Sequence, residues 1–304
     1  MLFTRKSKAA AVSIVSNTAL IILKLVSGII TGSVSLIAEA IHSSMDLVAA
    51  IVAFVSVNIS DRPADTQHPF GHGKAENVSG VIEGLLIFMA AGFIIYEAID
   101  RIITGAELEF LELGIVLIVI SIIVNTIVSR YLHKVSRSTD SLALEADATH
   151  LTTDVLTMVG VLVGLIIVRI TGMTVIDPVI AILVALVIIK AAYDITRKSF
   201  GGLMDTSLPE HEEAAIKSCL AEHNDLVVGF HKLRTRKSGS FRHIDLHLVI
   251  PGALKMDEAH DICDHLEQHI EGVLDNSDVT IHMEPCDTEC DLCIIVCNAR
   301  NREP

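Results

Sequence analysis

Two histidine–aspartate pairs carry the clearest chemistry in this sequence. His42 precedes Asp46 by four residues, His150 precedes Asp154 by the same step, and each pair lies inside a long apolar stretch. On an α-helix, residues four apart project from one face about 6 Å apart along the axis. If the two helices face each other, two imidazoles and two carboxylates converge on one point, and a tetrahedral divalent metal prefers such ligands.

The apolar surroundings make these pairs costly. A charged residue in the middle of a bilayer costs roughly 2.5–3.5 kcal/mol, so such groups seldom occur there without a function. The alternative is that each pair only hydrogen-bonds to neighbouring helices. That alternative explains one pair better than two pairs of the same spacing, and the sequence therefore favours an intramembrane metal site.

Six apolar stretches predict a membrane α-helical protein. Each reaches the roughly 20 residues that cross a bilayer, and the mean hydropathy of the chain is +0.56. The stretches cover residues 9–30, 34–59, 78–103, 111–133, 143–171 and 174–196.

Positive charges near the ends of these stretches set the expected orientation. Ten Lys or Arg residues flank the side that holds both termini, whereas the opposite side has only Arg101 and Arg169. Because positively charged loops stay in the cytoplasm, we expect a multi-pass protein of the cell inner (cytoplasmic) membrane with cytoplasmic N- and C-termini.

The chain changes character near residue 205. Residues 205–304 hold 20 Asp or Glu against 9 Lys or Arg, and so acidic a domain argues against nucleic acid as a partner. The pattern predicts a cytoplasmic α+β domain of ferredoxin-like α-β-β-α-β order, with helices on one face of the sheet. Its expected elements are helix 209–223, strands 227–236 and 241–250, helix 256–274 and strand 278–283.

We therefore expect a transport domain over 1–204, a metal-binding dimerisation domain over 205–285 and a cysteine-containing tail over 286–304. The tail carries four cysteines at three- and four-residue steps: Cys286, Cys290, Cys293 and Cys297. In a reducing cytoplasm these are not expected to form structural disulfides. The four cysteines could coordinate zinc or hold an iron–sulfur cluster, and the sequence leaves both interpretations open.

Several motifs resemble the cation diffusion facilitator family. Residues 31–46 (TGSVSLIAEAIHSSMD) resemble its second-helix signature, residues 68–76 (HPFGHGKAE) the loop that follows, and residues 147–154 (DATHLTTD) its fifth-helix signature. The resemblance continues through residues 203–205, 233–239 and 281–282. It implies a homodimer in the lipid bilayer that exports a divalent metal, most often zinc, in exchange for protons.

The resemblance also assigns residues. It places the transport site at His42, Asp46, His150 and Asp154, and a second metal site at Asp65, His68 and His72 in the loop. A third site, at the dimer interface, is implied at His231, His247, His260, His282 and Glu284, where Glu284 departs from the Asp that we expect in the family. His265 and His269 do not match this cluster, and we expect them to be exposed helix residues.

Ligand chemistry favours zinc, because imidazole suits it better than it suits magnesium or manganese. Cadmium, iron, cobalt and nickel remain alternative cargoes. An intramembrane metalloenzyme is a rival interpretation, but it needs an open coordination position and a general base such as that of a His-Glu-x-x-His pair, which the sequence lacks. A passive channel is disfavoured, since a closed four-ligand site binds too tightly for conduction. We therefore expect a secondary transporter and no enzyme.

Overall fold

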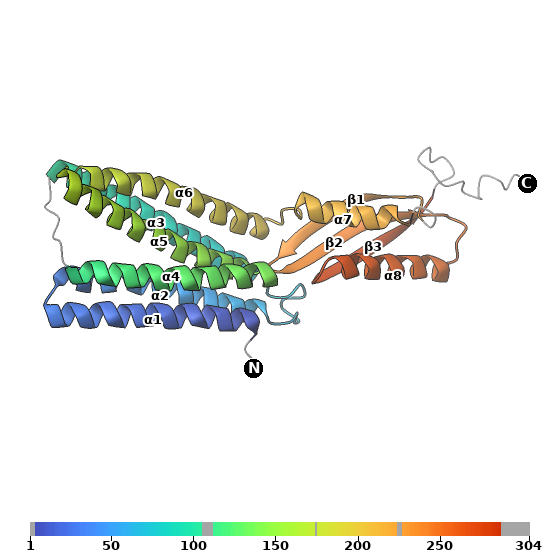
Figure 1. Ribbon diagram of the computed structural model, residues 1–304. Coiled ribbons are helices and arrows are strands. Elements are labelled where there is room, and N and C mark those ends of the chain that lie inside the picture. Colours follow the sequence, from blue (N-terminus) through green and yellow to red (C-terminus); the bar gives the residue numbers. More distant parts are fainter. Residues whose placement is uncertain (1–3, 105–111, 174, 224–226, 287–304) are drawn as a thin grey trace, which may run out of the picture. The chain divides into compact units, whose positions relative to one another are not determined.

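The computed structural model describes residues 4–104, 112–173, 175–223 and 227–286. Within these ranges the side chains of six helix residues are not described: Val34, Ser35, Ala38, His42, Glu112 and Leu113. The chain forms two compact units, Met1–Leu203 and Met204–Pro304, and Figure 1 shows the helices of the first and the mixed elements of the second.

The first unit contains six helices that are long and apolar enough to cross a membrane. They are α1 (Arg5–Thr31), α2 (Val34–Ser60), α3 (Lys74–Thr104), α4 (Glu112–Thr139), α5 (Leu142–Thr171) and α6 (Ile176–Leu203). The prediction of six spans is confirmed. Most of the helices extend beyond the apolar stretches, because polar first and last turns lengthen them.

Short polar and glycine signals set where these helices begin and end. Gly32 ends α1 in the left-handed conformation at φ 67°, and Ser33 then caps α2 by accepting a hydrogen bond from the Leu36 amide. Glycine adopts this conformation without strain, and a serine oxygen satisfies a free amide of the first turn. Ser141 caps α5 in the same way. These caps fix where the two helices that carry the histidine–aspartate pairs begin.

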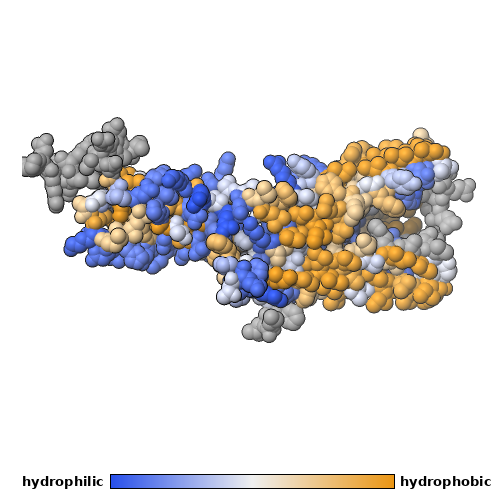
Figure 2. Space-filling view, turned by 180° about the vertical axis from the view of Figure 1, so that it is seen from behind, coloured by the Kyte–Doolittle hydropathy of each residue, from blue (hydrophilic) through white to orange (hydrophobic). Residues whose placement is uncertain are grey.

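The outer surface of the helical unit is apolar. Ile30, Ile103 and Ile170 are each 78% exposed, and Figure 2 shows hydrophobic residues covering this unit while hydrophilic residues dominate the other. Contiguous apolar surface of this extent is rare on soluble proteins. The helices are therefore built to face lipid.

Small residues bring α3 and α6 close together. A Cβ atom added at Gly80 would collide with Ser199 Oγ, and one added at Gly84 would collide with Thr196 Oγ1. Glycines four residues apart allow this approach, which is how membrane helices pack in the absence of a hydrophobic driving force. The Asn77 side-chain amide also donates to the Ser199 carbonyl at 3.2 Å.

The second unit has the predicted α-β-β-α-β order. Its elements are α7 (Glu210–Ala221), β1 (Gly229–Ser238), β2 (Phe241–Ile250), α8 (Met256–Val273) and β3 (Ser277–Pro285). The sheet order is β1-β2-β3, with β1 antiparallel and β3 parallel to the central strand. The predicted fold class is confirmed, and the expected bounds differ from the observed ones by no more than two residues.

One face of this sheet packs against both helices. Ile244, Leu246 and Leu248 of β2 are buried in one core with Cys219 of α7 and Leu266 of α8. Because side chains alternate between the two faces of a strand, the odd-numbered residues of β2, His247 among them, project from the opposite face. That face carries the predicted histidine cluster.

Candidate metal sites

Three of the four predicted transport-site residues converge inside the helical unit. Asp46 lies on α2, and His150 and Asp154 lie on α5. His150 Nε2 is 3.2 Å from Asp46 Oδ1 and 4.0 Å from Asp154 Oδ2, and one ligand atom from each residue lies within 4.8 Å of the others. His42 stands one turn before Asp46 on α2, but its side chain lies outside the described residues.

These groups are buried and only partly paired. The side chains of His150, Asp46 and Asp154 are 8%, 17% and 27% exposed. Among the described residues, His150 Nδ1 and Asp154 Oδ2 have no hydrogen-bond partner. Buried polar atoms are rarely left unpaired, because each one costs about 1–3 kcal/mol. A bound cation would satisfy the carboxylate oxygen.

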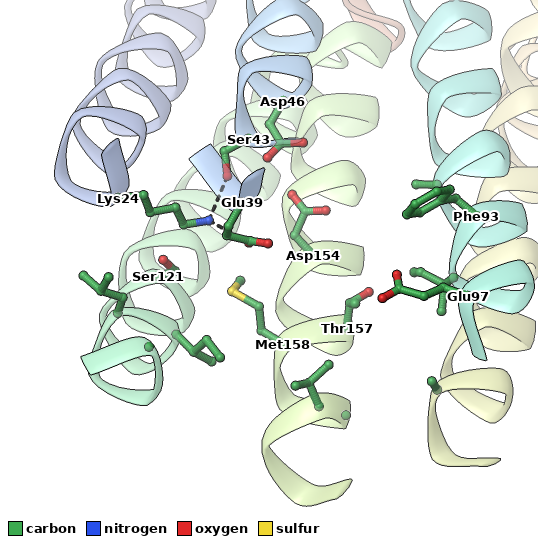
Figure 3. A pocket seen from close by; sticks show the side chains of 18 of the residues that line it. Lys24, Glu39, Ser43, Asp46, Phe93, Glu97, Ser121, Asp154, Thr157 and Met158 are labelled. Atoms are coloured by element: carbon green, nitrogen blue, oxygen red, sulfur yellow. Dashed lines mark hydrogen bonds and ion pairs between the residues drawn. The ribbon is translucent and has the colours of Figure 1, made fainter. Parts of the chain in front are cut away.

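A cavity of about 990 Å³ reaches this cluster and is lined by both carboxylates. Figure 3 shows Asp46 and Asp154 at its wall, with Thr157 and Met158 farther along α5. A ligand set that opens onto a cavity can exchange its ion with water, whereas a sealed site cannot.

The same cavity holds an ion pair that the sequence did not reveal. Lys24 Nζ of α1 lies 2.9 Å from Glu39 Oε1 and donates to Ser43 Oγ at 2.8 Å, as Figure 3 shows. Ser43 and Glu39 lie on α2, one and two turns before Asp46 respectively. The partner of Lys24 comes from another helix, and only the packing of α1 on α2 identifies it.

The predicted loop site also comes together. Asp65, His68 and His72 lie between α2 and α3 and offer ligand atoms within 4.8 Å of one another. Asp65 Oδ1 is 3.2 Å from His68 Nδ1, and Oδ2 is 3.4 Å from His72 Nε2. The His68 amide donates to the Asp65 carboxylate at 2.7 Å, and this hydrogen bond lowers the pKa of Asp65. The carboxylate is therefore kept ionised, as a metal ligand must be.

In the second unit, three histidines form a row across the sheet. His231 pairs with His247 on the neighbouring strand, and His247 pairs with His282 on the third. Paired residues on adjacent strands project from the same face. The rings of His247 and His282 lie 4.6 Å apart, and those of His231 and His247 lie 5.3 Å apart.

Glu284 joins this row. Its carboxylate accepts from His247 Nδ1 at 2.6 Å and lies 3.2 Å from His231 Nε2, with His282 Nε2 at 3.9 Å. The hydrogen bond from His247 lowers the pKa of Glu284. The glutamate is thus long enough to reach two strands. His260 lies apart from this row, on α8, where its Nδ1 is 3.5 Å from Asp264 Oδ1.

The cysteine tail falls mostly outside the described residues. Cys286 is the last residue that the structure describes, and Cys290, Cys293 and Cys297 lie in the part that is not described. The two remaining cysteines, Cys219 and Cys263, are buried in the core of the second unit, and burial raises the pKa of both thiols. These two are therefore poor metal ligands at neutral pH.

The chain matches two families of known domains. Residues 10–204 match the cation efflux transmembrane domain, and residues 208–286 match the cytoplasmic domain of cation efflux proteins.

Curated proteins are similar over nearly the whole length. An uncharacterised transporter of Synechocystis sp. is 39% identical over 91% of this chain and 89% of its own length. The cation-efflux pump FieF of Shewanella oneidensis is 30% identical over 92% of this chain and 94% of its own length. An uncharacterised transporter of Methanocaldococcus jannaschii is 31% identical over 92% and 98%.

Both domain matches, the six membrane helices and the similarity over full length agree with the resemblance found in the sequence motifs. The chain therefore belongs to the cation efflux, or cation diffusion facilitator, family and is a multi-pass membrane transporter of metal cations rather than an enzyme.

Proposed function

We propose that this protein exports zinc from the cytoplasm in exchange for protons, as a homodimer in the inner membrane with both termini cytoplasmic. The observation that carries the proposal is the convergence of Asp46, His150 and Asp154 at a cavity between helices. The positive charges near the span ends support the orientation. The match of residues 208–286 to a cytoplasmic domain supports it too.

The donor set supports zinc as the cargo. One imidazole and two carboxylates, with His42 proposed as the fourth ligand, would close a tetrahedral shell of mixed nitrogen and oxygen. Magnesium and manganese prefer all-oxygen shells of higher coordination number. Cadmium, iron, cobalt and nickel accept the same ligand types and are the alternative cargoes.

Ligand chemistry also supports coupling to protons. A metal binds imidazole only through a deprotonated nitrogen, and it binds carboxylates in their ionised form. His150 Nε2 donates to Asp46 when its proton is present, at 3.2 Å. Metal and protons therefore compete for the same atoms. If the site opens alternately to each side, proton binding on the outside releases the metal and an inward proton gradient drives export.

The two outer sites have proposed roles as well. Asp65, His68 and His72 would hold an ion in the loop between α2 and α3. The row of His231, His247 and His282 with Glu284 would bind a regulatory ion and tighten the dimer, with His260 as an additional ligand. The match to the cytoplasmic family supports the dimer.

Transport in proteoliposomes tests the proposed cargo and coupling. The purified protein should move zinc and cadmium far faster than manganese or magnesium, and an imposed pH gradient should accelerate it. Asp154→Ala should abolish uptake while the protein still folds and dimerises. Thr157→Val is a matched control, because Thr157 lies on the same helix and lines the same cavity. Manganese uptake as fast as zinc uptake would contradict the cargo, and rates independent of the pH gradient would contradict the antiport.

A further inference from the structure

Three histidines outside all the sites above meet between the two helices of the second unit. His223 follows the last turn of α7, and His265 and His269 lie four residues apart on α8. The His223 ring is 5.0 Å from that of His265 and 5.2 Å from that of His269, centroid to centroid, and the last two rings stack at 6.4 Å. As expected for exposed helix residues, His265 is exposed on α8, whereas His269 is half-buried. The expectation did not include His223, which joins them from another element.

The hydrogen bonds of His223 direct its Nε2 at this cluster. Its Nδ1 lies 2.9 Å from the carbonyl oxygen of Cys219. A carbonyl only accepts, so Nδ1 carries the proton and, in the neutral ring, Nε2 holds a lone pair. This Nε2 faces His265 Nε2 at 3.1 Å. A backbone carbonyl that fixes the tautomer in this way is the usual support of a metal-binding histidine.

The spacing of His223 from each of the other two rings fits a zinc-sized ion. With Zn–N bonds of about 2.0–2.1 Å, two nitrogen ligands of a tetrahedral zinc lie about 3.3 Å apart, and their ring centroids lie about 5.2 Å apart. The His223–His265 nitrogens and two of the three centroid distances agree with these values. The third pair, His265 and His269, needs to close by about 1 Å, which a side-chain rotation on one helix face provides.

The surroundings of the three histidines favour a bound metal cation over protonation of all three rings. Within the described residues, none of the three histidines is ion-paired with a carboxylate, and His269 Nδ1 is buried without a hydrogen-bond partner. Three protonated imidazoles this close would repel one another. A divalent ion held by neutral rings avoids that repulsion.

This cluster is separate from the histidine row on the sheet. Leu246 and Leu248 of β2 pack into the core beneath the helices, so His247 between them projects from the opposite face. The three-histidine cluster belongs to the helical layer, and the two sets of ligands lie on different sides of this domain.

We propose that His223, His265 and His269 form a divalent metal site of the zinc class that ties the end of α7 to α8. The site does not depend on the transport cluster or on the identity of the cargo. The fourth position remains for water.

Metal binding by the full-length protein in detergent tests the proposal. Zinc bound per chain is measured by elemental analysis after dialysis at a fixed free zinc concentration, for the unaltered protein and for His223→Gln and His265→Gln. Each variant should bind one zinc fewer per chain. His211→Gln is the control, because His211 is an exposed histidine at the start of α7 and outside the cluster. If both cluster variants bind as much zinc as the unaltered protein, or if the control loses the same ion, the proposal is wrong.

A replacement that keeps a ligand provides an independent readout. His265→Cys should retain the ion, and with cobalt in place of zinc it should add a thiolate-to-cobalt absorption band that the unaltered protein shows more weakly or not at all. Because the comparison is a difference between two proteins, cobalt bound at the cysteine tail cancels. A cobalt spectrum that is the same in both would overturn the assignment even if the glutamine variants fold poorly.

Discussion

Two buried clusters of charged residues in the helical unit differ in how completely their polar atoms are paired. Glu76 of α3 is fully buried, and its carboxylate accepts from Lys6, Ser60, Ser141 and the Ala143 amide at 2.6–3.3 Å. Both carboxylate oxygens of Glu76 therefore accept hydrogen bonds from residues of α1, α2 and the start of α5. The cluster of Asp46, His150 and Asp154 is also buried, but among the described residues two of its polar atoms have no hydrogen-bond partner.

The difference separates structural from functional burial. A buried charge is tolerated when its partners compensate the lost hydration. Glu76 therefore joins four helices and needs no further ligand. The second cluster lacks that compensation and opens onto a cavity, and we propose that a cation completes it. Changes in the first cluster should affect stability, whereas changes in the second should affect transport.

The largest expected effect is on transport in Asp154→Asn. Loss of a residue that only supports a metal ligand typically lowers metal affinity 10–100-fold, so loss of a ligand itself should lower zinc transport on the order of 100-fold or more. Thermal stability in detergent should stay near that of the unaltered protein, since the neutral amide removes a buried charge. Initial zinc uptake rates and melting curves on the same preparations check both statements, and Thr157→Val should leave both unchanged.

Glu76→Gln should show the reverse pattern. The substitution removes the negative charge that faces Lys6 at 3.0 Å, although Asp61 remains 3.5 Å away. Breaking a buried ion pair costs about 3–5 kcal/mol, so we expect a loss near the lower end of this range and a clear drop in melting temperature. Transport per folded molecule should persist. If the variant is as stable as the unaltered protein but inactive, the distinction between the two clusters fails.

The ion pair in the cavity provides a more graded test. Lys24 neutralises Glu39, whose side chain is 49% exposed, so solvent screens the effect of either charge on the ion. Lys24→Met should tighten zinc binding a few-fold, and Glu39→Gln should weaken it. The double variant should return close to the unaltered affinity. Titration calorimetry of the three variants measures their zinc affinities. Equal affinities in all of them would show that the pair has no electrostatic influence on the site.

The smallest expected effect concerns the sheet cluster outside the membrane. The hydrogen bond from His247 lowers the pKa of Glu284, so this contact contributes stability above the unfolded-state pKa and loses it as the pH falls through the lowered value. His247→Gln should raise the pKa of Glu284 toward its ordinary value. Carboxyl-carbon NMR of the metal-free protein measures the midpoint, and no change between the two proteins would exclude the contact.

Much of the fold could be predicted because its signals are local. Six apolar stretches of sufficient length left little freedom for the first unit. Alternation along residues 241–250 predicted β2 with its observed bounds, and the Asp65–His72 loop came together because its residues are neighbours in sequence.

Contacts between distant elements could not be predicted from residue patterns alone. Lys24 finds Glu39 only through the packing of α1 on α2, and His223 meets His265 only because α7 and α8 share one face of the sheet. For His260, the resemblance predicted a contact that the single chain does not contain. It was grouped with the sheet histidines, but within one chain it pairs with Asp264 on its own helix. Its role as an interface ligand stays a prediction.

The central claim is that the ion binds at the incompletely paired cluster of Asp46, His150 and Asp154 and not at the fully paired Glu76. Anomalous diffraction at the zinc edge, from crystals of the full-length protein grown with zinc, tests it directly. The account predicts a peak between α2 and α5, about 2.0–2.1 Å from His150 Nε2 and in contact with Asp46 and Asp154, and no peak beside Glu76. Zinc density at the loop and sheet sites but none at this cluster, or a peak at Glu76, would contradict it.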